Sequence, residues 1–141
     1  MGICKIYLSG GMTALCEEEQ TAWRRTFQNV FDVFDGNENT PVIFDPTQYY
    51  SLFYKEHKSD REAMEYDLYK LRNADLVIVN FNVPESIGTA MELMLAKEYH
   101  IPVIGLNENN VELHPWLKEC CTRICDSFDE LIDHVVGFYL N

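Results

Sequence analysis

The sequence predicts a single α/β domain over residues 1–141, with a five-stranded parallel sheet and helices on both of its faces. Short apolar runs alternate with helix-forming segments through the whole chain, which is the pattern of strand–helix–strand units with right-handed crossovers. The length suits one domain with a real core, and no repeat, linker or low-complexity tract divides it. At this size the default strand order is 2-1-3-4-5, as in flavodoxin-like (Rossmann-like) folds.

The first third of the chain contains two predicted strands and one helix. An apolar run over 3–8 is the first strand and leads into Ser9-Gly10-Gly11. The helix over 17–34 opens with three glutamates, which favour the helix dipole. We expect Arg24 and Arg25 of this helix to be solvated. A second strand covers 41–44, and the aromatic-rich segment 47–57 is expected to be a loop or short helical turn over the sheet. The apolar stripe of the helix, at helical spacing, is Trp23, Phe27, Val30, Phe31 and Phe34.

The remaining elements follow from capping signals and apolar runs. Ser59 and Glu62 match a capping box and start a helix that runs to about Asn73. The β-branched run over 76–79 is typical of a buried strand, and Ser86 is a good N-cap for the helix over 87–99. A fourth strand (101–106), a short helical piece (114–117), a fifth strand (122–125) and a closing helix (128–139) complete the pattern. The predicted buried stripe of the helix after Ser59 is Met64, Leu68 and Leu71.

Composition excludes several classes of function. The net charge of −12 argues against binding long nucleic acid, which needs a basic surface. No apolar run approaches the ~20 residues of a membrane span, and the first strand leads into glycines without the form of a signal peptide. The five cysteines have no zinc-ligand spacing, so reduced thiols in a cytoplasmic protein with no metal and no cofactor are expected.

Two carboxylates stand out as candidate site residues. Glu92 lies on the helix over 87–99, and its neighbours three and four positions away include no cation. Gly88, one turn earlier, costs helix stability and leaves room for a ligand. Glu92 is therefore either a carboxylate in a pocket or an ordinary exposed residue beside a packing glycine. Asp67 lies on the stripe between Met64 and Leu71, where a carboxylate needs partners or a water-filled pocket.

The topology predicts where these side chains meet. In an open α/β sheet, ligands bind beyond the carboxyl ends of the strands at the point where the strand order reverses, here between strands 1 and 3. Two glycines after the first strand either let backbone approach a ligand or form a plain turn. Asn82, which closes the third strand, is a further candidate for substrate binding. The residues predicted to gather at this point are Tyr7, Ser9, Gly10, Gly11, Asp67, Ser86 and Glu92.

The same residues resemble the nucleoside 2-deoxyribosyltransferase superfamily, which includes the 2′-deoxynucleoside 5′-monophosphate N-glycosidases. The Gly-x-x-Met-Glu-Leu run is the most specific of the matching pieces, and the pieces occur in the family's order over nearly the whole chain. They are Lys5-Ile6-Tyr7-Leu8-Ser9-Gly10, Asp67-Leu68 with Ala74-Asp75, and Ser86-Ile87-Gly88-Thr89-Ala90-Met91-Glu92-Leu93.

The resemblance implies an enzyme in which Glu92 is the nucleophile. It would attack C1′ of a 2′-deoxyribosyl group and form a covalent sugar–enzyme ester, by the logic of a retaining glycosidase. Tyr7 matches the tyrosine that orients the nucleophile, and Asp67 matches the carboxyl group that contacts base or sugar and helps proton transfer. A second nucleobase would resolve the ester in a transferase, and water would resolve it in a hydrolase.

The resemblance specifies the substrate class and the oligomeric assembly less closely than it specifies the nucleophile. Family members that act on free nucleosides usually carry Asp where this chain has Ser86, whereas the monophosphate N-glycosidases carry Ser, which suits a phosphate at a helix N-terminus. Against this, the loop at 10–13 lacks the arginine of the nucleotide hydrolases. Transferase activity is the first expectation, with the hydrolase or a non-catalytic nucleotide-binding module as alternatives. The family also implies a homo-oligomer, a dimer or higher, in which residues 107–116 reach a neighbouring site.

Overall fold

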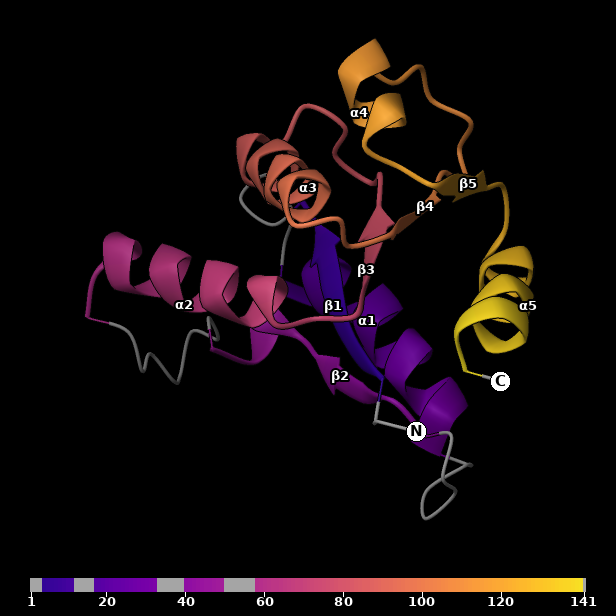
Figure 1. Ribbon diagram of the computed structural model, residues 1–141, viewed down its shortest axis with the longest axis horizontal. Helices are drawn as coiled ribbons and strands as arrows, with labels where there is room; N and C mark the ends of the chain where they lie inside the picture. Colours follow the sequence, from indigo (N-terminus) through magenta and orange to yellow (C-terminus); the bar gives the residue numbers. More distant parts are fainter. Residues whose placement is uncertain (1–3, 12–16, 33–39, 50–57, 141) are drawn as a thin grey trace.

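One parallel sheet organises the chain. The computed structural model describes residues 4–11, 17–32, 40–49 and 58–140. Its strands follow the order β2-β1-β3-β4-β5, and every neighbouring pair is parallel, which confirms the predicted fold class and strand order. The sheet is the middle layer of the molecule (Figure 1). The strands are β1 (Lys5–Gly10), β2 (Val42–Phe44), β3 (Leu76–Asn80), β4 (Val103–Leu106) and β5 (Arg123–Cys125).

The helices begin where the sequence places their caps. The Ser59 hydroxyl accepts a hydrogen bond from the backbone N–H of Glu62 at 3.1 Å, and the Ser86 hydroxyl accepts one from the N–H of Thr89 at 3.3 Å, so each satisfies a donor that the first turn leaves without a partner. The helices are α1 (Glu17–Asp32), the 3₁₀ turn η1 (Pro46–Tyr49), α2 (Asp60–Arg72), α3 (Ile87–Glu98), α4 (Pro115–Glu119) and α5 (Phe128–Tyr139).

Alternation along the strands divides the core into two layers. In β1, Ile6 and Leu8 pack with α1 and α5 on one face of the sheet, while Tyr7 belongs to the cluster with α2, α3 and α4 on the other face. Because successive strand side chains point to opposite faces, Ser9 lies on the same face as Tyr7. The arrangement puts the polar end of β1 on the side of the sheet that α2 and α3 cover (Figure 1).

The predicted buried residues of α1 and α2 agree with the structure only in part. Met64 was expected to be buried, and this prediction is wrong, since the side chain is 46% exposed. Phe27 and Phe31 of α1 are buried as predicted, and Trp23 and Val30 pack partly buried against them. Phe34 and most of the aromatic segment 47–57 lie outside the described residues. In the described part of the chain, no helix is long and apolar enough to cross a membrane.

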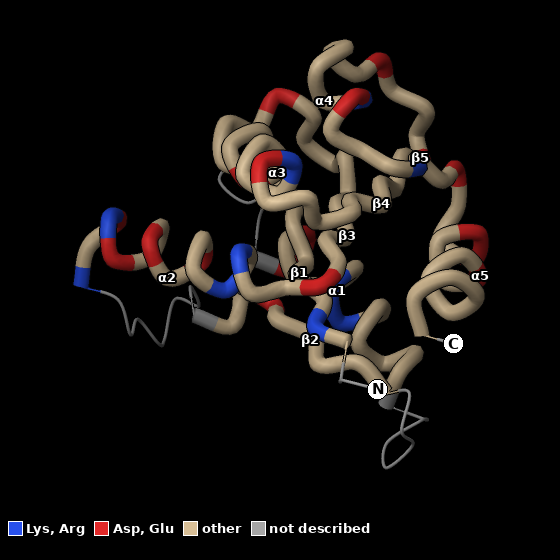
Figure 2. The backbone as a smooth tube through the Cα atoms, in the orientation of Figure 1, with Lys and Arg blue, Asp and Glu red and all other residues tan. Residues whose placement is uncertain are grey.

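Charged side chains are spread over the surface helices. Figure 2 shows acidic and basic residues interspersed along α2, with further acidic positions on α3 and α5. Arg61 and Glu65 of α2 form an exposed ion pair at 3.0 Å. The excess of acidic positions agrees with the net charge of −12.

Candidate active site

A cavity of about 520 Å³ opens at the carboxyl end of β1. It lies at the switch point, where the connections from β1 and β3 leave the sheet in different directions. Side chains from β1, α1, α2 and α3 line it. Six residues predicted for the site are among them, and they are Tyr7, Gly10, Asp67, Ser86, Gly88 and Glu92.

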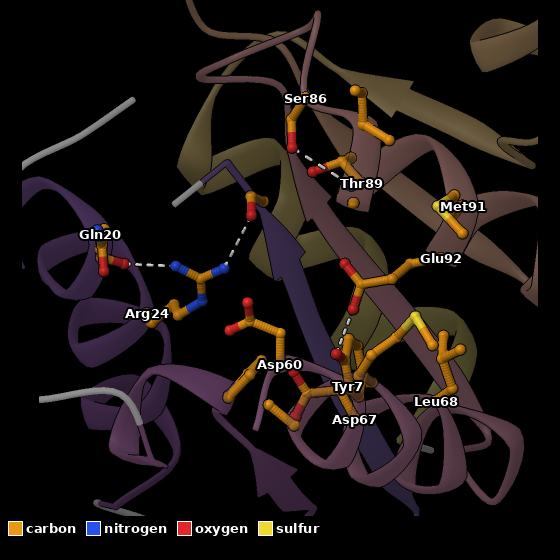
Figure 3. A pocket seen from close by; sticks show the side chains of 16 residues that line it. Tyr7, Gln20, Arg24, Asp60, Asp67, Leu68, Ser86, Thr89, Met91 and Glu92 are labelled. Carbon is orange, nitrogen blue, oxygen red and sulfur yellow. Dashed lines mark hydrogen bonds between the residues drawn. The ribbon is translucent and has the colours of Figure 1, made fainter. Parts of the chain in front are cut away.

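Two hydroxyl groups of β1 hold the Glu92 carboxylate. The Tyr7 hydroxyl donates to Glu92 Oε2, as Figure 3 shows, and the Ser9 hydroxyl donates to Glu92 Oε1 at 3.0 Å. Tyr7 and Ser9 can do this together because they are two positions apart on one strand face, and both are almost completely buried. Each carboxylate oxygen therefore has its own donor, and the orientation of Glu92 is fixed from the sheet.

Burial keeps Glu92 close to its titration point. The pKa of Glu92 is raised to about 7. Removal from water is the largest cause and the charge of Asp67 adds to it, whereas the hydrogen bonds from Tyr7 and Ser9 and the charge of Arg24 lower the pKa in part. Among the described residues, no lysine or arginine forms an ion pair with this carboxylate. At neutral pH a substantial fraction of Glu92 is ionised and free to act as a nucleophile or base.

Asp67 reaches the same cavity from α2. Its side chain is half-buried and lines the wall that α2 contributes. Met64, one turn earlier, lines this wall too, which explains why that methionine is not covered by the core. Glu92 and Asp67 thus place two carboxyl groups with different surroundings in one cavity, the usual arrangement for dividing nucleophilic and acid–base roles.

The first turn of α3 forms another wall. Ser86, Gly88 and Thr89 all line the cavity. A side chain at Gly88 would meet no atom within 4 Å, so this glycine leaves open space, as the sequence suggested. Thr89 is only 3% exposed, and its hydroxyl has no hydrogen-bond partner among the described residues. The wall therefore combines the backbone N–H groups of a helix N-terminus with the buried hydroxyl group of Thr89.

Gly10, the last residue of β1, and Gly11, which follows it, serve close packing. A Cβ atom at Gly10 would come within 3.1 Å of Trp23 Cζ2, and one at Gly11 would come within 2.4 Å of Val83 Cβ. The backbone N–H of Gly11 donates to Asn82 Oδ1 at 3.1 Å. Gly11 and Asn82 were predicted to bind substrate, but neither lines the cavity. They tie the end of β1 to the turn that follows β3.

Arg24 is the site residue that sequence reasoning missed. The prediction that it is solvated is wrong, since its side chain is 0% exposed and lines the cavity, whereas Arg25 is exposed as predicted. Arg24 and Arg25 are adjacent on an amphipathic helix, and the spacing of the apolar residues does not show which of the two arginines is buried. The adjacent indole and the small residue at Gly10, which lets α1 approach β1, are the features that produce the burial.

Two further features are a possible metal site and the segment 107–116. In the described part of the chain, no group of three His, Cys, Asp or Glu side chains is placed to hold a metal ion. The segment 107–116, expected to reach a neighbouring subunit, contributes nothing to the cavity of its own chain. Asn107 instead closes its own loop, with its side-chain amide bonded to the backbone of Val111 at 3.0 and 3.1 Å.

Fold and site together define a flavodoxin-like domain with a hydroxyl-held carboxylate at its switch point, and solved structures share this fold over nearly the whole chain. A conserved protein from Enterococcus faecalis V583 is 15% identical, with a TM-score of 0.76 over 96% of this chain and 99% of that chain. The 2-deoxyribosyltransferase of Bacillus psychrosaccharolyticus is 18% identical, with a TM-score of 0.70 over 91% of this chain and 90% of its own. The Clostridium botulinum CMP N-glycosidase BcmB is 18% identical, with a TM-score of 0.59 over 95% and 99% of the two chains.

These similarities show that the chain shares its fold with a 2-deoxyribosyltransferase and a CMP N-glycosidase, as the resemblance of the motifs implied. No protein-family model and no curated protein sequence matches the chain. Two of the similar structures described above have a stated activity, one as a 2-deoxyribosyltransferase and one as a CMP N-glycosidase.

Proposed function

We propose that the protein cleaves the N-glycosidic bond of 2′-deoxynucleosides and transfers the sugar to another nucleobase, with Glu92 as the nucleophile. The observation that carries the proposal is the pair of hydrogen bonds from Tyr7 and Ser9 to the Glu92 carboxylate inside the cavity. A structural glutamate on a helix gains little from such a setting, because burial raises its pKa and penalises its charge. A nucleophile gains a fixed direction of attack.

The proposed chemistry has two steps. In the first, a carboxylate oxygen of Glu92 forms a bond to C1′ as the C1′–N bond breaks, and the electron pair of that bond leaves with the base, which takes up a proton. Asp67, in the same cavity, is the group proposed to assist this proton transfer. In the second step, a ring nitrogen of an incoming base attacks C1′ from the opposite face and gives up its proton to Asp67, the bond between C1′ and the carboxylate oxygen breaks, and Glu92 is released as a carboxylate.

A second candidate function is hydrolysis of 2′-deoxynucleoside 5′-monophosphates. The observation in its favour is Ser86, an uncharged N-cap at the cavity wall, where a helix N-terminus favours an anion. Water would then replace the incoming base in the second step. The similarity of the fold to both a 2-deoxyribosyltransferase and a CMP N-glycosidase is consistent with either candidate.

Product analysis distinguishes the candidates. The protein is incubated with 2′-deoxyadenosine and free hypoxanthine, and separately with 2′-deoxyadenosine 5′-monophosphate. Formation of 2′-deoxyinosine supports the transferase, and formation of adenine with 2-deoxyribose 5-phosphate supports the hydrolase. Release of no base from either substrate, or from the corresponding pyrimidine compounds, contradicts both and leaves the non-catalytic nucleotide-binding module.

The role of Glu92 is tested by Glu92→Gln, with Glu98→Gln as the matched control. Glu98 lies on the same helix but is exposed, so the control makes the same chemical change outside the cavity. Loss of the nucleophile is expected to lower kcat by about 10⁴-fold or more, and intact-protein mass spectrometry is expected to detect a deoxyribosyl adduct on the wild type but not on Glu92→Gln. Equal activity of the two variants would remove Glu92 from the mechanism.

A further inference from the structure

The cavity contains a buried cation that the chemistry described so far does not use. Arg24 comes from α1, is 0% exposed and is the one lysine or arginine among the described residues that line the cavity. It donates from Nη1 to the carbonyl oxygen of Gln20 at 2.5 Å and from Nη2 to that of Gly10 at 3.3 Å. A guanidinium has five N–H donors, so most of its hydrogen-bonding capacity is not used by these two contacts.

The nearest counter-ion is only a loose partner. Arg24 Nε lies 3.7 Å from Asp45 Oδ1, and this nitrogen has no hydrogen bond within the described residues. The same oxygen of Asp45 already accepts from the backbone N–H of Thr47 at 2.9 Å and from its hydroxyl at 2.5 Å. A buried charge without a close hydrogen-bonded partner is costly to the fold, so Asp45 alone does not explain why an arginine occupies this position.

The guanidinium group of Arg24 is linked to the carboxylate of Glu92 through the end of β1. Figure 3 shows Arg24 and Glu92 on either side of the end of β1, with Tyr7 and Asp67 below. Arg24 is bonded to the carbonyl of Gly10, the residue that follows Ser9, and Ser9 in turn bonds Glu92. The cation is therefore connected to the nucleophile through two consecutive residues of one strand, and both groups line the same cavity.

We propose that Arg24 is a positioning residue for the reaction of Glu92: it fixes the end of β1 through the Gly10 carbonyl and supplies the positive charge that keeps the nucleophile ionised beside Asp67. The inference rests on the proposed function. Its physical basis is that carboxyl groups that line one cavity, here Asp60, Asp67 and Glu92, disfavour each other's ionisation, and a fixed cation offsets this effect. Because an arginine stays protonated at all relevant pH values, the offset is permanent.

The groups that face Glu92 come from three elements and each has a defined effect on its pKa. Tyr7 and Ser9 of β1 lower it through hydrogen bonds, Asp67 of α2 raises it by its charge, and Arg24 of α1 lowers it by its charge. Burial lowers the pKa of Arg24, and the negative charges around it, including those of Glu92 and Asp67, oppose that decrease. Removing the cation should therefore raise the pKa of Glu92 and leave less nucleophile in the ionised form near neutral pH.

The test compares pH profiles of kcat/KM for Arg24→Gln, Arg24→Lys and Arg25→Gln. We expect Arg24→Gln to lose about tenfold or more at pH 6, because each unit of pKa increase lowers the ionised fraction tenfold below the pKa, and to recover most of the loss near pH 9. Arg24→Lys keeps the charge and should show the acidic limb of the wild type. Arg25→Gln removes the same charge from an exposed neighbour and should leave the profile unchanged.

The outcomes separate this inference from a structural role and from the proposed function. A loss in Arg24→Gln that is equal at all pH values, or one that Arg24→Lys does not restore, would overturn it. A second measurement does not depend on turnover. The unfolding free energy is measured against pH with and without Glu92→Gln, first in the protein that has Arg24 and then in the Arg24→Gln variant. In each case the quantity of interest is the change caused by Glu92→Gln. In the Arg24→Gln variant, the pH range over which this change appears should move to higher pH. If the pH range does not move, the inference is contradicted, even if the enzyme acts on a different substrate.

Discussion

The Tyr7 hydroxyl donates a hydrogen bond to Glu92 Oε2, across 85 positions of sequence. This contact joins β1, an interior strand of the sheet, to the helix whose N-terminus forms the cavity wall. The tyrosine is 0% exposed and stacks on Phe44, with ring centroids 5.4 Å apart. The direction of the Glu92 carboxylate is thus determined by the rigid centre of the fold rather than by a surface loop.

Replacing Tyr7 by Phe should weaken catalysis more than folding. The variant keeps the ring packing but removes a hydrogen bond to a charged group, which is worth about 1.5–3 kcal/mol. We expect kcat/KM at pH 6 to fall about 10–100-fold. Because this bond lowers the pKa of Glu92, its loss raises that pKa, so the acidic limb of the pH profile should move to higher pH.

Ser9→Ala provides the comparison for this prediction. It removes the donor to the other oxygen of the same carboxylate, at 3.0 Å, and should shift the limb in the same direction. A Tyr7→Phe profile that falls without any shift of the acidic limb would mean that the tyrosine affects the reaction by another route, such as direct contact with the sugar.

Glu92 should also make the stability of the wild type depend on pH. Its pKa of about 7 in the folded state lies above its ordinary value in an unfolded chain, so the folded state binds more protons between these two values. The associated stability is fully present below the unfolded pKa and is lost as pH rises through about 7. Since Glu92 is partly accessible to solvent, the loss is at most roughly 3 kcal/mol.

Glu92→Gln tests this dependence because glutamine does not ionise. The variant should be more stable than the wild type at pH 8, by up to roughly 3 kcal/mol, and the difference should nearly vanish at pH 4.5 to 5. Urea unfolding at several pH values measures it, and Glu98→Gln on the exposed side of α3 should show no such trend. A difference that is constant with pH would indicate that the folded-state pKa of Glu92 is not raised.

The fold could be predicted because its signals are local and redundant. The β-branched run of β3 and the serine caps at Ser59 and Ser86 each specify an element without help from the rest of the chain. The alternation of strands and helices then fixes a parallel sheet. Met64 was misplaced because its helical spacing says which face of α2 it occupies, but does not say that this face borders a cavity.

The site was predictable where a residue type is unusual for its position. Asp67 and Glu92 drew attention because carboxylates on apolar or cation-free faces need an explanation, and both line the cavity. Arg24 gave no such signal, since arginine is common on a surface helix. Its burial depends on the close approach of α1 to the end of β1, a tertiary relationship that spacing in one helix does not encode.

The glycines of the site should respond in opposite ways to alanine. At Gly11 the new methyl group would lie 2.4 Å from Val83 Cβ, so Gly11→Ala should cost about 1–3 kcal/mol of stability by overpacking. At Gly88 nothing lies within 4 Å and the residue is in the first turn of α3, so Gly88→Ala should stabilise by about 0.5–1 kcal/mol through helix propensity. Chemical denaturation of both variants checks the prediction, and destabilisation by Gly88→Ala would show that the space is not open.

Ser86→Asp should change which substrates the cavity accepts. Aspartate is as good an N-cap as serine, so the bond to the N–H of Thr89 can be kept and the unfolding free energy should stay within about 0.5 kcal/mol of the wild type. The new negative charge faces the cavity that Ser86 lines, and like charges at close range repel by several kcal/mol when poorly solvated. The ratio of kcat/KM for a 2′-deoxynucleoside 5′-monophosphate to that for the free nucleoside should therefore fall about tenfold or more.

Ser86→Asn is the matched control for the charge. Asparagine caps helices as well as aspartate does and has nearly the same shape, but it brings no charge to the N-terminus of α3. If the 5′ end of the substrate lies against Ser86, only the aspartate variant should discriminate against the phosphate, and raising the ionic strength should weaken that discrimination in part. Equal ratios in the two variants would place the 5′ end elsewhere in the cavity, and would remove the reason for regarding Ser86 as the position that separates nucleosides from their monophosphates.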